Sequence, residues 1–239
     1  MLIAVMPSKT SKLIGNRLAL AGTILYFLEW VAIAFIPDVP TDRLGEGQSA
    51  IVDAYSSHAG RAGFAAGWFA FVLIGRVVFV AGVRSSLRDS PRALPFADIA
   101  LAAMTLSVAF EVTATTLSAA GAWLAHAHAA PSAIVALDAV DSMLLYPVFV
   151  VIGVSVLACS IGMLLSGLFR KWVPWLGVVA GVLLVAGGMV GGATAGTSGG
   201  LHDATAGGGL GVPVFWIWMI ATSVVLFRAA PRRREAPLQ

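Results

Sequence analysis

Three ionisable residues, Glu29, Arg76 and Glu111, lie inside long apolar stretches of this 239-residue chain. Each costs about 2.5–3.5 kcal/mol at the centre of a bilayer, so such residues pair inside a helix bundle or mark a functional path. Two acids and one base leave one carboxylate without a full partner, and apolar surroundings keep such a group protonated near neutral pH. A protonated carboxyl group in an apolar cavity can donate its proton to an alkene or epoxide, or carry it for a transporter.

Polar neighbours accompany both acids. Helical spacing places one polar face on the expected helix around Glu111, formed by Ser107, Glu111, Thr115 and Ser118. Tyr26 precedes Glu29 by three residues, so its hydroxyl can donate to a nearby carboxylate. Arg76 has only apolar helical neighbours, so its partner must come from another helix, and Glu111 and Glu29 are the natural candidates. The alternative interpretation is a buried Glu–Arg pair that only fixes helix register.

Membrane helices must position these residues. The chain is 59% hydrophobic and 11% charged, whereas a soluble domain keeps about a quarter of its residues charged. Six stretches come close to the roughly 20 apolar residues that a spanning helix requires: Leu18–Ile36, Phe64–Val83, Phe96–Leu124, Met143–Leu165, Trp175–Ala195 and Val212–Phe227. We therefore expect an all-α fold, with a single six-transmembrane-helix domain at 18–228 between an N-terminal tail (1–17) and a basic tail (229–239).

The basic residues predict the orientation. Twelve of the 15 Lys and Arg residues fall on one side of the expected spans: Lys9, Lys12, Arg17, Arg84, Arg88, Arg92, Arg170, Lys171, Arg228, Arg232, Arg233 and Arg234. The positive-inside rule then places both termini in the cytoplasm. Because these charges sit beside hydrophobic segments, the net charge of +3 indicates a lipid bilayer as partner and no nucleic acid. The composition, low in Lys and rich in Ala, Gly, Val and Arg, favours a multi-pass protein of a bacterial inner (cytoplasmic) membrane.

Two short motifs favour structural interpretations. The sequence at Gly196–Gly200 matches the G-x-S-x-G nucleophile pattern, but it follows a span instead of a strand, so a flexible loop is expected. Asp138 and Asp141 are spaced i, i+3 and could hold magnesium and a diphosphate. No second Asp-rich motif accompanies them, and helix capping by Asp141 is the simpler interpretation.

Metal and cofactor binding are not expected. Cys159 is the sole cysteine and lies in an apolar segment, which suits a small buried hydrophobe. The spacing of the histidines matches no common zinc pattern; they are His58, His126, His128 and His202. We therefore predict no metal site and no cofactor.

The fifth expected span is rich in glycines spaced four apart: Gly177 and Gly181, Gly187 and Gly191, Gly188 and Gly192. Such spacing lets helix backbones approach closely. Packing inside the bundle is the first interpretation, and a homo-oligomer through this helix is the alternative. Several indole rings near span ends are expected to anchor at the membrane interface: Trp123, Trp172, Trp175, Trp216 and Trp218.

The segment at 168–185, LFRKWVPWLGVVAGVLLV, resembles a family of uncharacterised bacterial six-helix membrane proteins. A basic turn, a Pro-Trp-Leu-Gly and a small-residue helix recur there in that family. The sequence Phe110-Glu111-Val112 is similar to its glutamate-bearing helix. This resemblance implies a six-helix fold and draws attention to Glu111, but it implies no activity.

More distantly, the chain resembles the small integral-membrane terpene cyclases, which are compact helical bundles of similar length. Those proteins protonate a prenyl chain with membrane-embedded acids, so the resemblance implies Glu29 and Glu111 as acids. It also implies cation stabilisation by the π faces of Tyr26, Trp30, Trp68 and Phe149. The soluble cyclase signatures Asp-x-Asp-Asp and Asp-Asp-x-x-Asp are absent, which removes diphosphate ionisation and leaves proton-initiated cyclisation.

Three functions therefore stay open. The leading hypothesis is an intramembrane acidic site that acts on a hydrophobic, lipid-like or terpenoid molecule, with proton-initiated cyclisation or isomerisation as its most concrete chemistry. In it, Glu111 and Glu29 are catalytic, and the substrate contacts are Arg76, Tyr26, Trp30, Ser107, Thr115, Trp68 and Phe149. The alternatives are a small proton-coupled transporter, although no convincing inverted repeat is visible, and a structural subunit of a membrane complex. Whether the chain is an enzyme stays undecided at this point.

Overall fold

The computed structural model describes residues 9–30, 46–56, 59–196 and 208–229, and within these ranges its regular elements are all helices. The helices are α1 (Lys9–Phe27), α3 (Gln48–Ser56), α4 (Ala59–Val72), α5 (Ile74–Leu87), α6 (Leu94–His126), α7 (Pro131–Ser166), α8 (Trp172–Ala193) and α10 (Gly211–Ala229). The all-α prediction is confirmed.

Five helices are long and apolar enough to cross a membrane, and they correspond to the second to sixth expected spans. One of them is the rod Ala59–Leu87, in which α4 continues into α5 across Leu73. The first expected span includes the second half of α1 and continues into residues 31–36, which lie outside the described residues. The chain therefore has the helices of a multi-pass membrane protein, since five of them meet the length and composition that a membrane span requires.

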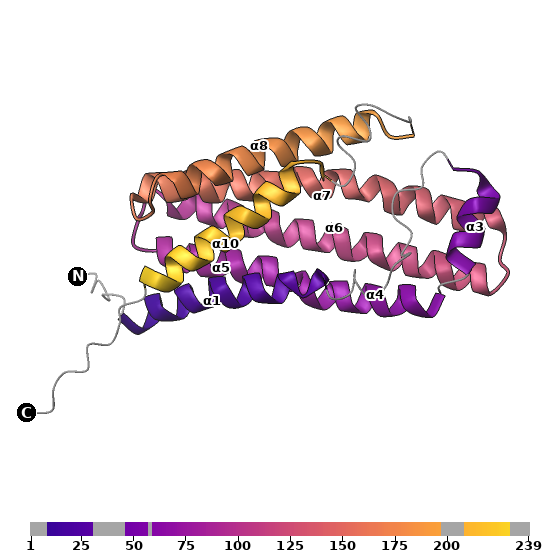
Figure 1. Cartoon of the computed structure of the whole chain (residues 1–239), viewed down its shortest axis with the longest axis horizontal. Coiled ribbons are helices and arrows are strands. Elements are labelled where there is room, and N and C mark those ends of the chain that lie inside the picture. Colours follow the sequence, from indigo (N-terminus) through magenta and orange to yellow (C-terminus); the bar gives the residue numbers. More distant parts are fainter. Residues whose placement is uncertain (1–8, 31–45, 57–58, 197–207, 230–239) are drawn as a thin grey trace, which may run out of the picture.

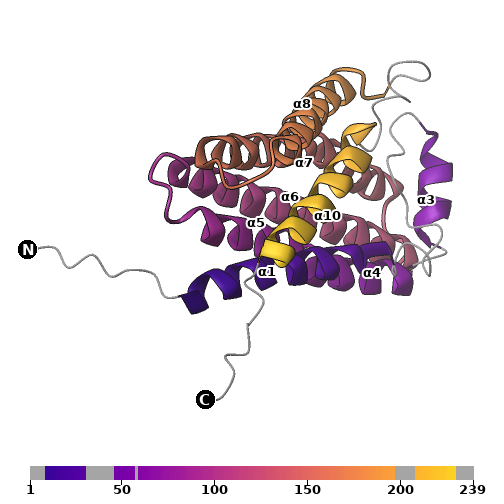
Figure 2. The same ribbon diagram turned by 60° about the vertical axis from the view of Figure 1, so that its left-hand side comes forward.

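The long helices lie side by side, and α10 crosses obliquely between α8 and α1 (Figure 1). The start of α1, the end of α10, the α5–α6 turn and the α7–α8 turn all lie at one end of the bundle (Figures 1 and 2). These segments carry much of the basic cluster, including Arg88, Arg92, Arg170, Lys171 and Arg228. The fold thus gathers these five basic residues at one end of the bundle.

At the opposite end, α3 packs across α6 and α7 (Figure 1). These two helices have 33 and 36 residues, about 50 and 54 Å at 1.5 Å per residue, which exceeds the roughly 30 Å of a hydrocarbon core. Tyr55 of α3 is 1% exposed, and its hydroxyl donates to Asp138 Oδ1 at 3.0 Å. Burial raises the pKa of Tyr55 above its usual value, so the phenol stays protonated and remains a donor.

The capping interpretation of Asp141 is wrong. Helix α7 begins at Pro131, with Ala130 as its N-cap, so Asp141 lies well inside the helix. Asp138 instead holds α3 against α7, because its buried carboxylate accepts the hydrogen bond from Tyr55 of α3. A sequence window of apolar residues misses this first part of α7, which carries both carboxylates.

Helices α1 and α5 approach each other backbone to backbone. The contact, here named the α1–α5 seam, is made by small residues: Gly15, Ala19 and Gly22 on α1, and Gly75 and Gly82 on α5. A methyl group on Gly22 would overlap the backbone of Phe79 and Gly75, and one on Gly75 would lie 2.5 Å from the Tyr26 nitrogen. Small residues on membrane helices allow this approach. The seam therefore fixes Tyr26 beside the turn of α5 that carries Arg76.

The glycines of α8 face the interior of the same chain. A side-chain carbon on Gly181 or Gly188 would meet the backbone of α7, and one on Gly177 would meet Ser160 and Trp218. These glycines are therefore used for packing against α7 and α10. The expected homo-oligomer through this helix stays a prediction, and these glycines do not support it.

The seam can be tested with a matched pair of glycines. We expect Gly22→Ala to lower the free energy of unfolding by about 1–3 kcal/mol, because the added methyl forces the two backbones apart. Gly67→Ala is the control: Gly67 is exposed on α4 with nothing near its Cβ position, so its thermal midpoint in detergent stays the same or rises. Equal midpoints for the two variants would contradict the seam.

Candidate functional site

Arg76 projects from α5 just after the interruption at Leu73. Its backbone nitrogen bonds to the Leu73 carbonyl at 3.0 Å, three residues back, which is a tight turn between α4 and α5. The side chain is 2% exposed. A charged group at this depth requires a partner, because an isolated buried charge is strongly unfavourable.

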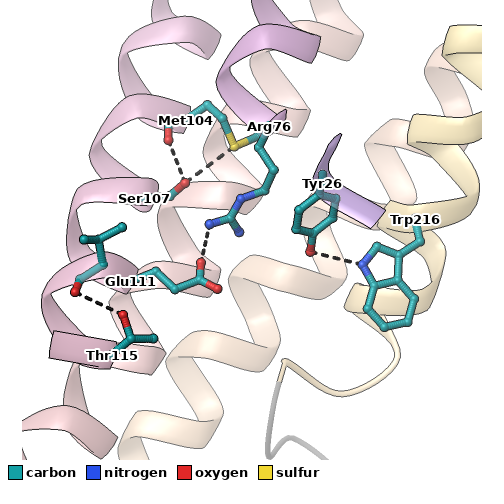
Figure 3. A network of polar contacts seen from close by, with 8 residues as sticks. Tyr26, Arg76, Met104, Ser107, Glu111, Thr115 and Trp216 are labelled. Atoms are coloured by element: carbon teal, nitrogen blue, oxygen red, sulfur yellow. Dashed lines mark hydrogen bonds and ion pairs between the residues drawn. The ribbon is translucent and has the colours of Figure 1, made fainter. Parts of the chain in front are cut away.

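Glu111 supplies that partner. A terminal guanidinium nitrogen of Arg76 donates to the Glu111 carboxylate, and the two side chains point toward each other from α5 and α6 (Figure 3). The Glu111 side chain keeps 16% of its surface exposed. The expectation that another helix provides the partner of Arg76 is confirmed.

Tyr26 lies on the other side of the guanidinium (Figure 3). The Arg76 Cζ atom lies 5.4 Å from the centroid of the Tyr26 ring, within the range of a cation–π interaction. The Tyr26 hydroxyl accepts a hydrogen bond from Trp216 Nε1 at 3.2 Å. The guanidinium is thus held between a carboxylate of α6 and an aromatic face of α1.

Glu29 follows a second helix interruption. The Leu28 nitrogen bonds back three residues to the Leu25 carbonyl at 3.2 Å, and Trp68 Nε1 donates to the Leu28 carbonyl at 3.0 Å. Glu29 interacts electrostatically with Glu111 and Arg76, and also with the Tyr26 hydroxyl. The three charged groups that the sequence places in separate spans therefore lie in one cluster.

The charge balance distinguishes the two acids. Among the described residues, the ion pair of Arg76 is with Glu111, while Glu29 acts on this pair from nearby. One guanidinium balances one carboxylate, so the cluster is neutral when the second carboxyl group carries a proton. Because Arg76 pairs with Glu111, Glu29 is the acid of the cluster that lies outside this ion pair.

Three aromatic side chains lie beside the cluster: Phe27, Trp30 and Trp216. Trp30 and Trp216 meet edge to face with centroids 4.9 Å apart, and Phe27 contacts Trp216 at 6.3 Å. Sequence reasoning missed Phe27 and Trp216 as site residues. The only signal in the sequence was Trp216 itself, two positions before Trp218 in an apolar segment, and it was interpreted as a membrane anchor.

The interface interpretation of Trp218 is wrong, and that of Trp216, which is half-buried, stays a prediction. Trp218 is completely buried and meets Phe79 edge to face at 5.3 Å, and Trp216 binds Tyr26. Trp216 therefore faces α1, and Trp218 faces α5. The remaining three are exposed, as expected for interface anchors: Trp123, Trp172 and Trp175.

The other candidate residues have local partners. Ser107 donates to the Met104 carbonyl at 2.8 Å, and Thr115 donates to the Val112 carbonyl at 3.1 Å, so both hydroxyls bond within α6 (Figure 3). Trp68 stacks on Phe64 at 6.2 Å, and Phe149 packs against Gly208. Of the predicted site residues, the cluster thus brings together Glu29, Arg76, Glu111, Tyr26 and Trp30, with Trp68 at its edge.

The remaining motifs fall outside the cluster. His126 and His128 are exposed at the end of α6, and Cys159 is buried as expected. His58, His202 and residues 197–200 lie outside the described residues. The described part of the chain contains no group of three or more His, Cys, Asp or Glu side chains placed to hold a metal ion.

Comparisons of the chain with protein-family models, with curated proteins and with solved structures find no match. Any functional conclusion therefore rests on the cluster itself.

The pair can be tested with a double-mutant cycle. We expect Arg76→Met to cost about 3–5 kcal/mol of unfolding free energy, because it leaves Glu111 without its counter-charge. The double variant Arg76→Met with Glu111→Leu should regain most of that loss, since no charge stays unpaired. Unfolding midpoints in detergent measure both effects. Additive losses in the double variant would mean that the two side chains do not interact energetically.

Proposed function

We propose that the chain spans a bacterial cytoplasmic membrane six times, with both termini in the cytoplasm. The five long apolar helices and the basic residues gathered at one end of the bundle support this topology. The first span includes residues 18–27 of α1, because they add an apolar stretch that pairs with α5 along the seam.

Cysteine labelling tests this topology. Cys159→Ser removes the single, buried cysteine and gives a background for two new positions. Ser132→Cys, at the start of α7, should react with a membrane-impermeant maleimide on intact cells. Ser90→Cys, in the α5–α6 turn, should react only after lysis. The reverse pattern would invert the proposed topology.

The site acts, on this proposal, as a Brønsted acid on a hydrophobic molecule. The observation that carries it is the convergence of a second acid, Glu29, on an ion pair that is already neutral. Glu29 is the proton donor, and the Arg76–Glu111 pair is a fixed dipole that keeps the other charges balanced.

The chemistry is an isomerisation or cyclisation of an alkene-containing lipid or terpenoid. Glu29 donates its proton to one alkene carbon, and the new C–H bond leaves a carbocation on its neighbour. The π faces of Tyr26, Trp30 and Trp216 stabilise that cation. Loss of a different proton to the Glu29 carboxylate regenerates the acid, so no other reactant is consumed. This role matches what the resemblance to membrane terpene cyclases implies.

Solvent deuterium tests the acid. Purified protein in nanodiscs, incubated in D₂O with total membrane lipids of the source cells, should transfer deuterium into a lipid detected by mass spectrometry. Glu29→Gln should abolish the transfer, by at least about a hundredfold given the contribution of a general acid. The matched control Glu46→Gln, at an exposed position before α3, should keep it. A folded Glu29→Gln variant with undiminished transfer would contradict the proposal.

Proton-coupled transport is the second candidate. The observation in its favour is that helix interruptions at Leu28 and Leu73 lie beside Glu29 and Arg76, and interrupted membrane helices commonly form the binding sites of transporters. In proteoliposomes, lipid flux that follows a pH gradient, without deuterium in the lipid, would favour the transporter. A structural subunit would show neither signal, and Glu29→Gln would then change stability alone.

A further inference from the structure

One donor of the buried guanidinium has no partner in the part of the chain that the structure describes. An arginine side chain carries five N–H groups, and the described contacts of Arg76 include the terminal nitrogen that binds Glu111. Arg76 Nε is fully buried and has no hydrogen-bond partner among the described residues. Buried polar atoms in proteins are almost always hydrogen-bonded, and each exception requires an explanation, such as a bound water or ion, or a functional role.

Arg76 Nε belongs to the guanidinium at the centre of the charged cluster. The guanidinium lies between Glu111 and Tyr26 (Figure 3), and the accessible surface here belongs to Glu111 and Glu29, while Arg76 is 2% exposed. The Glu111 side chain beside the guanidinium is 16% exposed, so an acceptor that reaches Nε along it also meets the ring of Tyr26. Other unpartnered atoms, such as Trp218 Nε1 and Ser160 Oγ, lie where even a methyl group on Gly177 would overlap them.

The charge balance restricts the acceptor. Because Arg76 and Glu111 already neutralise each other, an anionic ligand would bring an unpaired charge into an apolar interior, at high cost. A neutral oxygen meets no such penalty. A carbonyl oxygen offers two lone pairs and no proton of its own, so it matches a donor without adding another unsatisfied group.

We propose that the molecule bound at this site is a lipid that carries an uncharged carbonyl oxygen, and that this oxygen accepts a hydrogen bond from Arg76 Nε. The hydrocarbon part lies along Tyr26, Trp30 and Trp216. This inference rests on the proposed binding of a hydrophobic molecule and specifies its polar group.

Three isoprenoid probes of similar length test the assignment: farnesylacetone, a ketone; β-farnesene, a hydrocarbon; and farnesoate, a carboxylate. Quenching of tryptophan fluorescence in detergent micelles measures their affinities for the full-length protein. We expect the ketone to bind about tenfold or more tightly than the hydrocarbon, as a hydrogen bond to a charged group predicts. Farnesoate should bind more weakly than the ketone.

Variants assign the preference to Arg76. Arg76→Lys keeps a positive charge near Glu111 and removes Nε, so the ketone and the hydrocarbon should then bind equally. If this variant does not fold, Arg76→Met with Glu111→Leu gives the same comparison in a neutral interior. The matched control is Arg84→Lys on the same helix, whose arginine is paired with Asp98 outside the cluster; it should keep the preference.

The outcomes separate this inference from the proposed function. Equal binding of ketone and hydrocarbon by the natural sequence overturns the inference and leaves acid chemistry on a hydrocarbon. Tighter binding of farnesoate than of the ketone also overturns the inference, because the polar group would then be an anion and not a neutral carbonyl. Binding of none of the probes, with deuterium still transferred to a membrane lipid, also overturns the inference alone. Absence of both binding and deuterium transfer overturns the inference and the function together.

Discussion

A single positive charge in an apolar bundle constrains much of this structure. Arg76 lies too deep to reach water, so a carboxylate has to come to it, and Glu111 does so from α6. The aromatic ring of Tyr26 meets the other side of the guanidinium from α1. Three helices are thereby held in register by one side chain. The pair adds little net stability over a hydrophobic replacement, and its advantage is the specific arrangement that it enforces.

That arrangement depends on glycine as much as on charge. Tyr26 can face Arg76 because Gly22 and Gly75 let the two backbones touch. Where this close contact ends, both helices leave the regular α-helical pattern, at Leu28 and at Leu73, and Trp68 satisfies the Leu28 carbonyl. Backbone irregularity at membrane depth persists only where neighbouring groups supply hydrogen bonds. Glu29 follows the irregular turn at Leu28 and interacts electrostatically with the Arg76–Glu111 pair.

Local pattern was sufficient for some of these features and insufficient for others. Hydropathy located five of the spans to within a few residues at most ends, and the lack of polar neighbours around Arg76 correctly required a partner on another helix. The same reasoning did not anticipate that the hydroxyls of Ser107 and Thr115 donate to carbonyls of their own helix, because a shared helical face with Glu111 does not decide this. Trp216, Trp218 and the contact between Tyr55 and Asp138 depend on how α10 and α3 cross the bundle. Crossing angles are tertiary properties that no single-segment pattern contains.

The separation of Arg76 and Glu111 along the chain has a consequence for biogenesis. The two residues are 35 positions apart, so at 5–20 residues per second a ribosome makes Arg76 about 2–7 s before its final partner. During that interval, Glu29 is the one acid of an expected span that has already been synthesised. A nascent hairpin of α1 and α4–α5, closed by its glycines, can then enter the bilayer with Glu29 and Arg76 compensating each other. When α6 arrives, Glu111 forms the ion pair with Arg76, and Glu29 stays beside this pair as a second acid.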